Sequence, residues 1–254
     1  MERDRRVPAS PGRAAGLRVG WHAVGEGPYT SPMAYTLHVG EKRYSSWSAR
    51  PWILLRGLGL PFEERLVSLQ PDPGKAGRFA SLPGGRVPVL DDGAVRVWDS
   101  LAIVEYLAER HPGVWPADPA ARAFARSSCA EMHGGFQALR GQMSMDVAAR
   151  RPQRRRGDAV LADIARIEAL WTEARRRFGQ GGPHLFGAFG AADAYFAPVA
   201  FRFRTYGVEL GGEAGVALRT LLAHPAVQAW SDAGSSEPRL ADHDLDVMYP
   251  EDRS

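Results

Sequence analysis

The stretch AYTLHVGEKRYSSWSARPWILLRGLGL, residues 34–60, decides how this chain begins its fold. Residues 34–39 are apolar and β-rich, and they predict a short strand. After a polar loop over 40–46, apolar residues recur at helical spacing over 48–58 and predict a helix. Glycines and a proline end this helix, and residues 63–69 predict a second strand. A crossover of this kind is right-handed and makes the two strands parallel.

The chain after this crossover predicts a β-hairpin and then a helix. Short strands over 87–90 and 94–98 flank an Asp-Gly turn, which is a strong hairpin signal. Either Asp99 or Ser100 can cap the helix that follows, because both side chains accept hydrogen bonds from the first turn. Apolar residues at helical spacing extend that helix over 101–110.

These elements divide the chain into two domains and two flanking segments. Residues 33–112 hold a small mixed sheet with helices in a thioredoxin-like order, whereas residues 118–235 show only helical patterns between Pro and Gly breaks. The expected fold class is therefore an α+β thioredoxin-like domain followed by an all-α domain. We interpret residues 1–32 as a disordered arm or an over-extended start before Met33, with an organellar transit segment as a weaker alternative. Residues 236–254 are expected to form a loosely held polar tail.

Composition excludes several classes of function. Among the 254 residues, 44% are hydrophobic and 24% charged, which is typical of globular proteins, and no apolar run reaches the ~20 residues of a membrane span. A net charge of +3 is too small for a nucleic-acid interface unless it is clustered, and the cluster within 150–156 lacks aromatic residues and predicts a solvated loop. The single cysteine, Cys129, indicates a reducing compartment and a buried small side chain. We expect a cytoplasmic protein with no metal, membrane or nucleic-acid partner.

A serine-rich turn stands where the first strand gives way to the first helix. Residues 44–48 read Tyr-Ser-Ser-Trp-Ser, so their hydroxyls lie beside unpaired N–H groups at a partly positive helix end. Such a site stabilises an anion. Serines at this position are nevertheless more often caps than catalysts, so the turn alone assigns no function.

Two further motifs can hold a peptide. In Gly-Arg-Val-Pro-Val-Leu, residues 85–90, a proline opens a strand, and a cis Val87-Pro88 bond would leave the backbone of Val87 free for a ligand. Asp99 and Ser100 begin a helix directly after a strand. There Ser100 and the helix N-terminus can hold an α-carboxylate, and Asp99 can hold an α-ammonium group.

Taken in order, these motifs resemble the soluble glutathione S-transferase family over about residues 33–235. Residues 45–50, Ser-Ser-Trp-Ser-Ala-Arg, are similar to the serine-type thiol-activating motif, closest to the zeta-like Ser-Ser-Cys-Ser-x-Arg. Residues 85–90 resemble the loop that binds the glutathione backbone, and Asp99-Ser100 the γ-glutamyl site. Residues 189–193 resemble the family's folding motif, with a glycine where Ser or Thr is usual.

The resemblance implies that glutathione is a co-substrate. A serine would stabilise the glutathione thiolate, which attacks a small apolar electrophile or reduces a hydroperoxide. Ser45 lies five residues before Arg50, as in zeta and tau patterns, and is favoured; Ser46, four residues before it, matches phi-like patterns. The resemblance also implies a homodimer.

The resemblance further assigns binding residues on both sides of the sulfur. Glutathione would be held by Val87, Pro88, Asp99 and Ser100, and Arg86 would reach the glycyl carboxylate unless it is a solvated loop residue. The electrophile pocket would lie near the serine turn and a helix over 123–145, each member having core or interface packing as its alternative. Its candidate residues are Tyr44, Trp47, Met132, His133, Phe136 and Arg140.

Two other functions stay open at this point. The chain can be a non-catalytic glutathione-fold module that binds a ligand or a protein partner, because folds of this kind host many functions. It can also be a maleylacetoacetate-type isomerase, although Trp47 stands where the zeta-like pattern has cysteine, and this counts against that activity.

Overall fold

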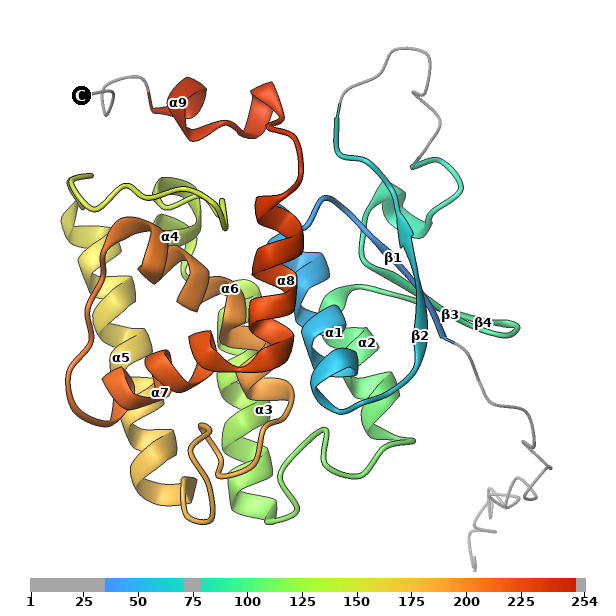
Figure 1. Cartoon of the computed structure of the whole chain (residues 1–254). Coiled ribbons are helices and arrows are strands. Elements are labelled where there is room, and N and C mark those ends of the chain that lie inside the picture. The colour runs from blue at the N-terminus through green and yellow to red at the C-terminus, as the bar shows by residue number, and fades with distance from the viewer. Residues whose placement is uncertain (1–34, 71–78, 250–254) are drawn as a thin grey trace, which may run out of the picture. The chain divides into compact units, whose positions relative to one another are not determined.

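The computed structural model describes residues 35–70 and 79–249, which belong to one compact unit. The expected N-terminal arm and the start at Met33 lie outside these residues. A four-stranded sheet with the order β2-β1-β3-β4 comes first in the chain, and helices follow it (Figure 1). The strands are β1 (Tyr35–Val39), β2 (Phe62–Leu66), β3 (Val89–Asp92) and β4 (Val95–Trp98).

The register of the sheet confirms the predicted crossover and hairpin. β1 pairs in parallel with β2, with Leu37 opposite Glu64, and antiparallel with β3, with Leu37 opposite Leu90. β3 and β4 pair antiparallel around the Asp-Gly turn. Because β1 is an inner strand, its alternate residues Tyr35, Leu37 and Val39 are buried in the core.

Two helices pack on the sheet and face the rest of the chain. α1 (Ser46–Gly57) begins two residues earlier than the sequence predicts. It packs against α6 (Ala191–Tyr206) and α8 (Pro225–Ser235), while α2 (Ser100–Ala108) packs beside α1 (Figure 1). Of the two predicted caps for α2, Asp99 is the one that caps it: its carboxylate accepts hydrogen bonds from two backbone N–H groups of the first turn. These helix starts position the candidate site.

The second half of the described chain is helical, as predicted. The single helix expected over 123–145 is wrong, because Phe136 follows two glycines and adopts a left-handed φ of 56°, which separates α3 from α4. The helices are α3 (Pro119–Gly134), α4 (Gln137–Gln142), α5 (Asp158–Phe178), α6 (Ala191–Tyr206), α7 (Gly212–Ala223), α8 (Pro225–Ser235) and α9 (Leu245–Met248), and the short 3-10 turns are η2 (Pro83–Gly85) and η3 (Ala241–His243).

The start of α6 explains the glycine in the folding motif. Asp193 accepts hydrogen bonds from the N–H groups of Gly190 and Leu185, which fixes the turn before the helix. A Cβ on Gly190 would lie 2.9 Å from the carbonyl oxygen of Val114, so a serine there would need its neighbours to move. Cys129 is fully buried nearby in α3, as predicted, and burial raises the pKa of its thiol.

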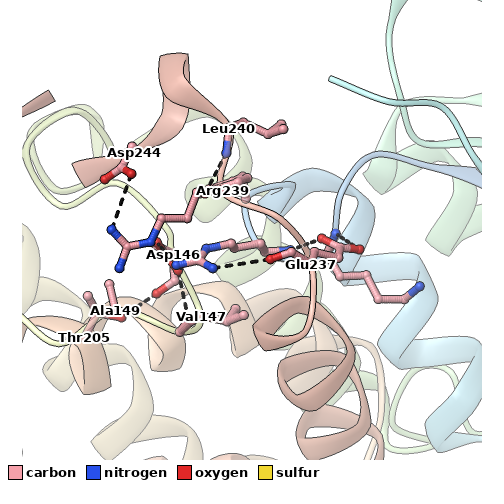
Figure 2. Close-up of polar contacts among 12 residues, drawn as sticks. Asp146, Val147, Ala149, Thr205, Glu237, Arg239, Leu240 and Asp244 are labelled. Carbon is pink, nitrogen blue, oxygen red and sulfur yellow. Dashed lines mark hydrogen bonds and ion pairs between the residues drawn. The ribbon is translucent and has the colours of Figure 1, made fainter. Parts of the chain in front are cut away.

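The segment from Glu237 to Tyr249 is not the loosely held tail that the sequence predicts. Leu240, Leu245 and Tyr249 are buried. Glu237 contacts the loop between β1 and α1, and Arg43 of that loop donates hydrogen bonds both to the Glu237 carbonyl and to Asp146, which belongs to the segment between α4 and α5 (Figure 2). Burial of three apolar side chains stabilises this segment on the helices.

Part of the arginine cluster binds the same segment. Arg151 forms an ion pair with Asp246, and the guanidinium of Arg154 lies 3.5 Å from the ring centroid of Tyr249. The predicted solvated loop is therefore wrong for these two arginines. Within residues 35–70 and 79–249, no helix has the length and apolarity to cross a membrane, and no group of three His, Cys, Asp or Glu residues suits a metal ion.

Candidate active site

A cavity of ≈ 730 Å³ lies where the starts of α1 and α2, the loop before β3 and the facing ends of α3 and α4 come together. A second cavity, of ≈ 680 Å³, lies around the loop over 113–118 and shares no residue with the predicted site. The first cavity is lined by Trp47, Pro83, Gly84, Arg86, Val87, Pro88, Trp98, Asp99, Ser100, His133, Gly134, Gln137 and Arg140.

The structure brings together the residues predicted to bind a peptide. Arg86, Val87, Pro88, Asp99 and Ser100 all line the first cavity, although they come from two separate stretches of the chain. The pairing of β3 with β4 brings these stretches together, because the loop before β3 and the helix after β4 lie at the same end of the hairpin. The cavity therefore has the set of polar groups that the sequence motifs imply.

Three of the predicted pocket residues line the cavity and three do not. Trp47, His133 and Arg140 line it. Met132 and Phe136 instead belong to the hydrophobic core, because they lie on the inner side of α3 and of the turn after it. The Tyr44 ring stacks on His243, away from the cavity lining.

The two candidate serines differ in exposure and in hydrogen bonding. Ser45 is buried, and its hydroxyl donates to the Ser48 hydroxyl at 2.7 Å, so it makes no side-chain cap for α1. Ser46 is half-buried at the first residue of α1, and among the described residues its hydroxyl has no hydrogen-bond partner. Neither serine is part of the cavity lining, but Trp47, the next residue, is.

The loop before β3 presents free backbone groups. The Val87-Pro88 peptide bond is cis, the form that the sequence analysis considered for this loop. Within the part of the chain that the structure describes, neither the N–H nor the carbonyl of Val87 has a hydrogen-bond partner. A peptide ligand that pairs with both groups of Val87 would satisfy them, since backbone donors and acceptors that are removed from water need partners.

A chain of polar contacts connects the start of α2 to the helical domain. One carboxylate oxygen of Asp99 lies 3.4 Å from Nε2 of His133, and Nδ1 of His133 lies 2.7 Å from the Tyr195 hydroxyl. That hydroxyl in turn lies 3.2 Å from the hydroxyl of Ser100. Burial raises the pKa of Tyr195, so its hydroxyl keeps its proton at neutral pH. His133 and Tyr195 therefore orient both residues that are predicted to bind an α-amino acid group.

Comparisons with known proteins show the family to which the chain belongs. The family model described as "Glutathione S-transferase, N-terminal domain" matches residues 44–110, and the model described as "Glutathione S-transferase, C-terminal domain" matches residues 148–233. The chain belongs to the glutathione S-transferase family. The two matches also support the fold class, a thioredoxin-like domain followed by an all-α domain.

The relatives that the chain resembles carry different names. A stringent starvation protein A homolog from Haemophilus ducreyi is 25% identical over 172 residues, which cover 67% of this chain and 76% of that protein. A probable maleylacetoacetate isomerase from Caenorhabditis elegans is 36% identical over 97 residues, covering 37% of this chain and 44% of the relative. A glutathione transferase homolog from Burkholderia, solved with bound glutathione, superposes with a TM-score of 0.59 at 24% identity, covering 81% of this chain and 99% of that structure.

In this glutathione S-transferase family member, Trp47 lies between cationic groups. The Arg50 guanidinium is 4.0 Å from the ring centroid of Trp47 and 4.2 Å from that of Tyr195, and its Nε donates to the Tyr195 carbonyl. Burial lowers the pKa of Arg50 to about 10, which leaves it charged at neutral pH. The Arg140 guanidinium is 5.3 Å from the ring centroid of Trp47. Two positive charges therefore flank one wall of the cavity.

Sequence reasoning missed Tyr195 and the cavity residues Trp98 and Gln137. Tyr195 lies in a helix whose residues are almost all buried, so its pattern indicates only core packing. Trp98 is exposed at the end of β4, directly before Asp99. Its position next to a predicted binding residue was the sequence signal that could have placed it in the cavity. Gln137 begins α4, a helix that the sequence did not separate from α3.

Proposed function

We propose that this protein is a glutathione transferase that binds glutathione in the cavity beside Asp99 and ionises its thiol at the start of α1. The observation that carries the proposal is the meeting of the Val87-Pro88 loop and the Asp99-Ser100 helix start in one cavity next to Trp47. The thiolate then attacks an electrophile or reduces a hydroperoxide. Family membership supports a homodimer as the working form, and the single cysteine supports a cytoplasmic location.

The cavity offers a partner for each charged end of the tripeptide. The oxygen of Asp99 that faces His133 can take the γ-glutamyl ammonium, because the other oxygen caps α2. Ser100 and the N-terminal turn of α2 can hold the α-carboxylate. Val87 pairs with the peptide backbone, and Arg86 reaches the glycyl carboxylate.

The energy needed to ionise the thiol is within reach of the serine turn. A thiol with a pKa near 8.5 is about 3% ionised at pH 7, and lowering that pKa by about two units requires about 2.7 kcal/mol. A hydroxyl hydrogen bond to a charged sulfur contributes about 1.5 to 3 kcal/mol, and a helix N-terminus about 0.3 to 1 kcal/mol.

Ionisation alone gives little acceleration. Lower basicity also lowers nucleophilicity, so a gain of about 25-fold in thiolate leaves a net gain of roughly threefold. Most of the rate enhancement must therefore come from holding the electrophile against the sulfur, which effective molarities show to be a far larger effect.

Glutathione titration and turnover measured on matched variants test the proposal. Asp99→Asn keeps the cap of α2 but removes the charge, so it should weaken glutathione binding about 10- to 100-fold. Asp118→Asn is the control, since Asp118 caps α3 in the same way and lies outside this cavity. An unchanged affinity in Asp99→Asn, or no glutathione binding by the wild type, contradicts the proposal.

The same measurements separate the two alternatives. Glutathione binding without turnover across a broad panel of electrophiles and hydroperoxides favours a non-catalytic binding module. Turnover of maleylacetoacetate favours the isomerase that the name of the Caenorhabditis elegans relative suggests, although Trp47 replaces the cysteine of the zeta-like motif.

A further inference from the structure

We propose that the electrophile taken by this site carries a carboxylate, and that Arg140 binds it. This inference rests on the proposed function and replaces the apolar electrophile that the sequence predicts with an anionic one. Two observations support the inference: the charges on the cavity wall and the position of Arg140 beside Trp47.

The charged side chains that line the cavity do not balance. Besides His133, they are two arginines, Arg86 and Arg140, and one carboxylate, Asp99. Among the described residues neither arginine forms an ion pair, and Asp99 lies near His133 rather than near an arginine. Arg50, buried behind Trp47, adds a further positive charge and has no carboxylate partner within the same residues. The wall of the cavity is thus positively charged.

Glutathione does not use all of this charge. In the arrangement proposed above, its ammonium group pairs with Asp99, one carboxylate binds Ser100 and the helix end, and the other binds Arg86. Arg140 is left without an anionic partner. A half-buried guanidinium without one is costly, because charged groups that are removed from water need a counter-charge.

Arg140 stands at the end of the cavity where the electrophile must bind. Its guanidinium lies 5.3 Å from the ring centroid of Trp47, which directly follows Ser46 in the serine-rich turn. Nη1 of Arg140 donates to the carbonyl of His133 at 3.4 Å, whereas Nη2 makes no hydrogen bond within the part of the chain that the structure describes and is not buried. A planar guanidinium with unused N–H groups suits a carboxylate, which it can bind through two parallel hydrogen bonds.

Arg140 would position the electrophile rather than take part in bond formation. With an aryl chloride, the sulfur electron pair forms the carbon–sulfur bond and chloride leaves with the electrons of the carbon–chlorine bond. Arg140 would hold the carboxylate at the far side of the ring. A different role, in which Arg140 stabilises the thiolate itself, would affect neutral and anionic electrophiles equally.

Two aryl chlorides that differ in charge and by one methyl group test this inference. The substrates are 4-chloro-3-nitrobenzoate and its methyl ester, and each kcat/KM is divided by the uncatalysed rate constant to remove intrinsic reactivity. In the wild type the corrected value should be at least about tenfold higher for the carboxylate. Arg140→Gln should abolish that preference and leave the ester within about threefold of wild type, while Arg140→Lys should keep part of it. Arg166→Gln, which removes an exposed arginine of α5, is the matched control.

Each other outcome has a defined meaning. The inference is wrong if Arg140→Gln leaves the preference for the carboxylate substrate intact. It is also wrong if the variant lowers kcat/KM equally for both substrates while the pKa of the bound thiol rises. If neither substrate turns over, the affinities of the two glutathione conjugates replace the rates, and the carboxylate conjugate should bind the wild type about tenfold or more tighter than the ester. If the two conjugates bind with equal affinity while glutathione itself still binds, this inference is wrong but the proposed function is not. Failure to bind glutathione overturns the proposed function as well.

Discussion

The hydroxyl of Ser45 donates a hydrogen bond to the hydroxyl of Ser48 at 2.7 Å. Ser48 also accepts a hydrogen bond from the N–H of Gly40, so these groups connect the end of β1 to the first turn of α1. The Ser45 hydroxyl is therefore buried and already hydrogen-bonded, whereas the Ser46 hydroxyl has no such partner among the described residues. This difference separates two neighbours that sequence spacing leaves as alternatives, and on this ground we propose Ser46, rather than Ser45, as the hydroxyl that donates to the glutathione sulfur.

We predict that Ser46→Ala raises the pKa of the bound glutathione thiol by about one to two units, because a hydroxyl donor to a charged sulfur is worth about 1.5 to 3 kcal/mol. The measurement is a pH titration of thiolate absorbance in the complex. Ser45→Ala should instead lower the free energy of unfolding by about 1 kcal/mol, through loss of the bond to Ser48. Ser81→Ala, at an exposed position outside the cavity, is the control. A raised thiol pKa in Ser45→Ala alone would return the role to Ser45.

We predict that His133→Phe raises the KM for glutathione about three- to tenfold with a smaller change in kcat. The variant keeps a ring against Trp47 but removes the contacts to Asp99 and Tyr195, each worth about 0.5 to 1.5 kcal/mol. Tyr195→Phe should likewise raise the KM for glutathione with a smaller change in kcat, because it breaks the same chain of contacts. A fall in kcat at constant KM would instead place His133 against the electrophile.

The parts of the fold that the sequence predicted are local ones. The β1 strand and the hairpin each depend on a few neighbouring residues, and both are found in the structure. The sequence limited the cap of α2 to Asp99 or Ser100 and offered a cis bond before Pro88, and the structure has the Asp99 cap and the cis bond. The family resemblance located the electrophile pocket only by region. It could not decide that Arg140 faces the cavity while Met132 faces the core.

The features that the sequence did not predict depend on contacts between distant residues. Periodicity in α6 marks Tyr195 as a buried residue but contains no information about its partners on α2 and α3. The break at Phe136 was missed because the apolar pattern continues across it. The segment after Ser235 has a polar composition, so the sequence did not show that Glu237 binds the loop after β1 and that Asp246 and Tyr249 bind residues of α4 and of the segment that follows it.

The acid stability of the sheet should depend on Asp91. The hydrogen bond from Arg96, together with one from His38, lowers the pKa of Asp91 from 3.8 to about 2. A depressed pKa in the folded state stabilises the protein above pH 3.8, and this contribution is lost as the pH falls toward 2. We predict that Asp91→Asn lowers stability at pH 7 by less than about 1 kcal/mol, since solvent screens the largely exposed Arg96. Urea unfolding should show a smaller drop between pH 4 and pH 2 in the variant, and identical drops would contradict this account.

Glu237 should control the loop that carries the serine turn. Its carboxylate accepts hydrogen bonds from the N–H groups of Lys42 and Arg43, at 3.1 and 2.9 Å, across about 195 residues of chain (Figure 2). Because glutamine has one acceptor oxygen and no charge, Glu237→Gln leaves one of these donors poorly satisfied. We predict a loss of about 1 to 3 kcal/mol in the free energy of unfolding.

The melting temperature should fall by about 2 to 4 °C for each kcal/mol lost, and calorimetry measures it directly. Glu109→Gln, at an exposed position, is the control and should melt like the wild type. If the loop positions the thiol, kcat should fall together with stability, because a displaced turn moves the thiolate away from the electrophile. A destabilised variant with unchanged kcat at a temperature where it is fully folded would show that the C-terminal segment supports the fold without tuning the site.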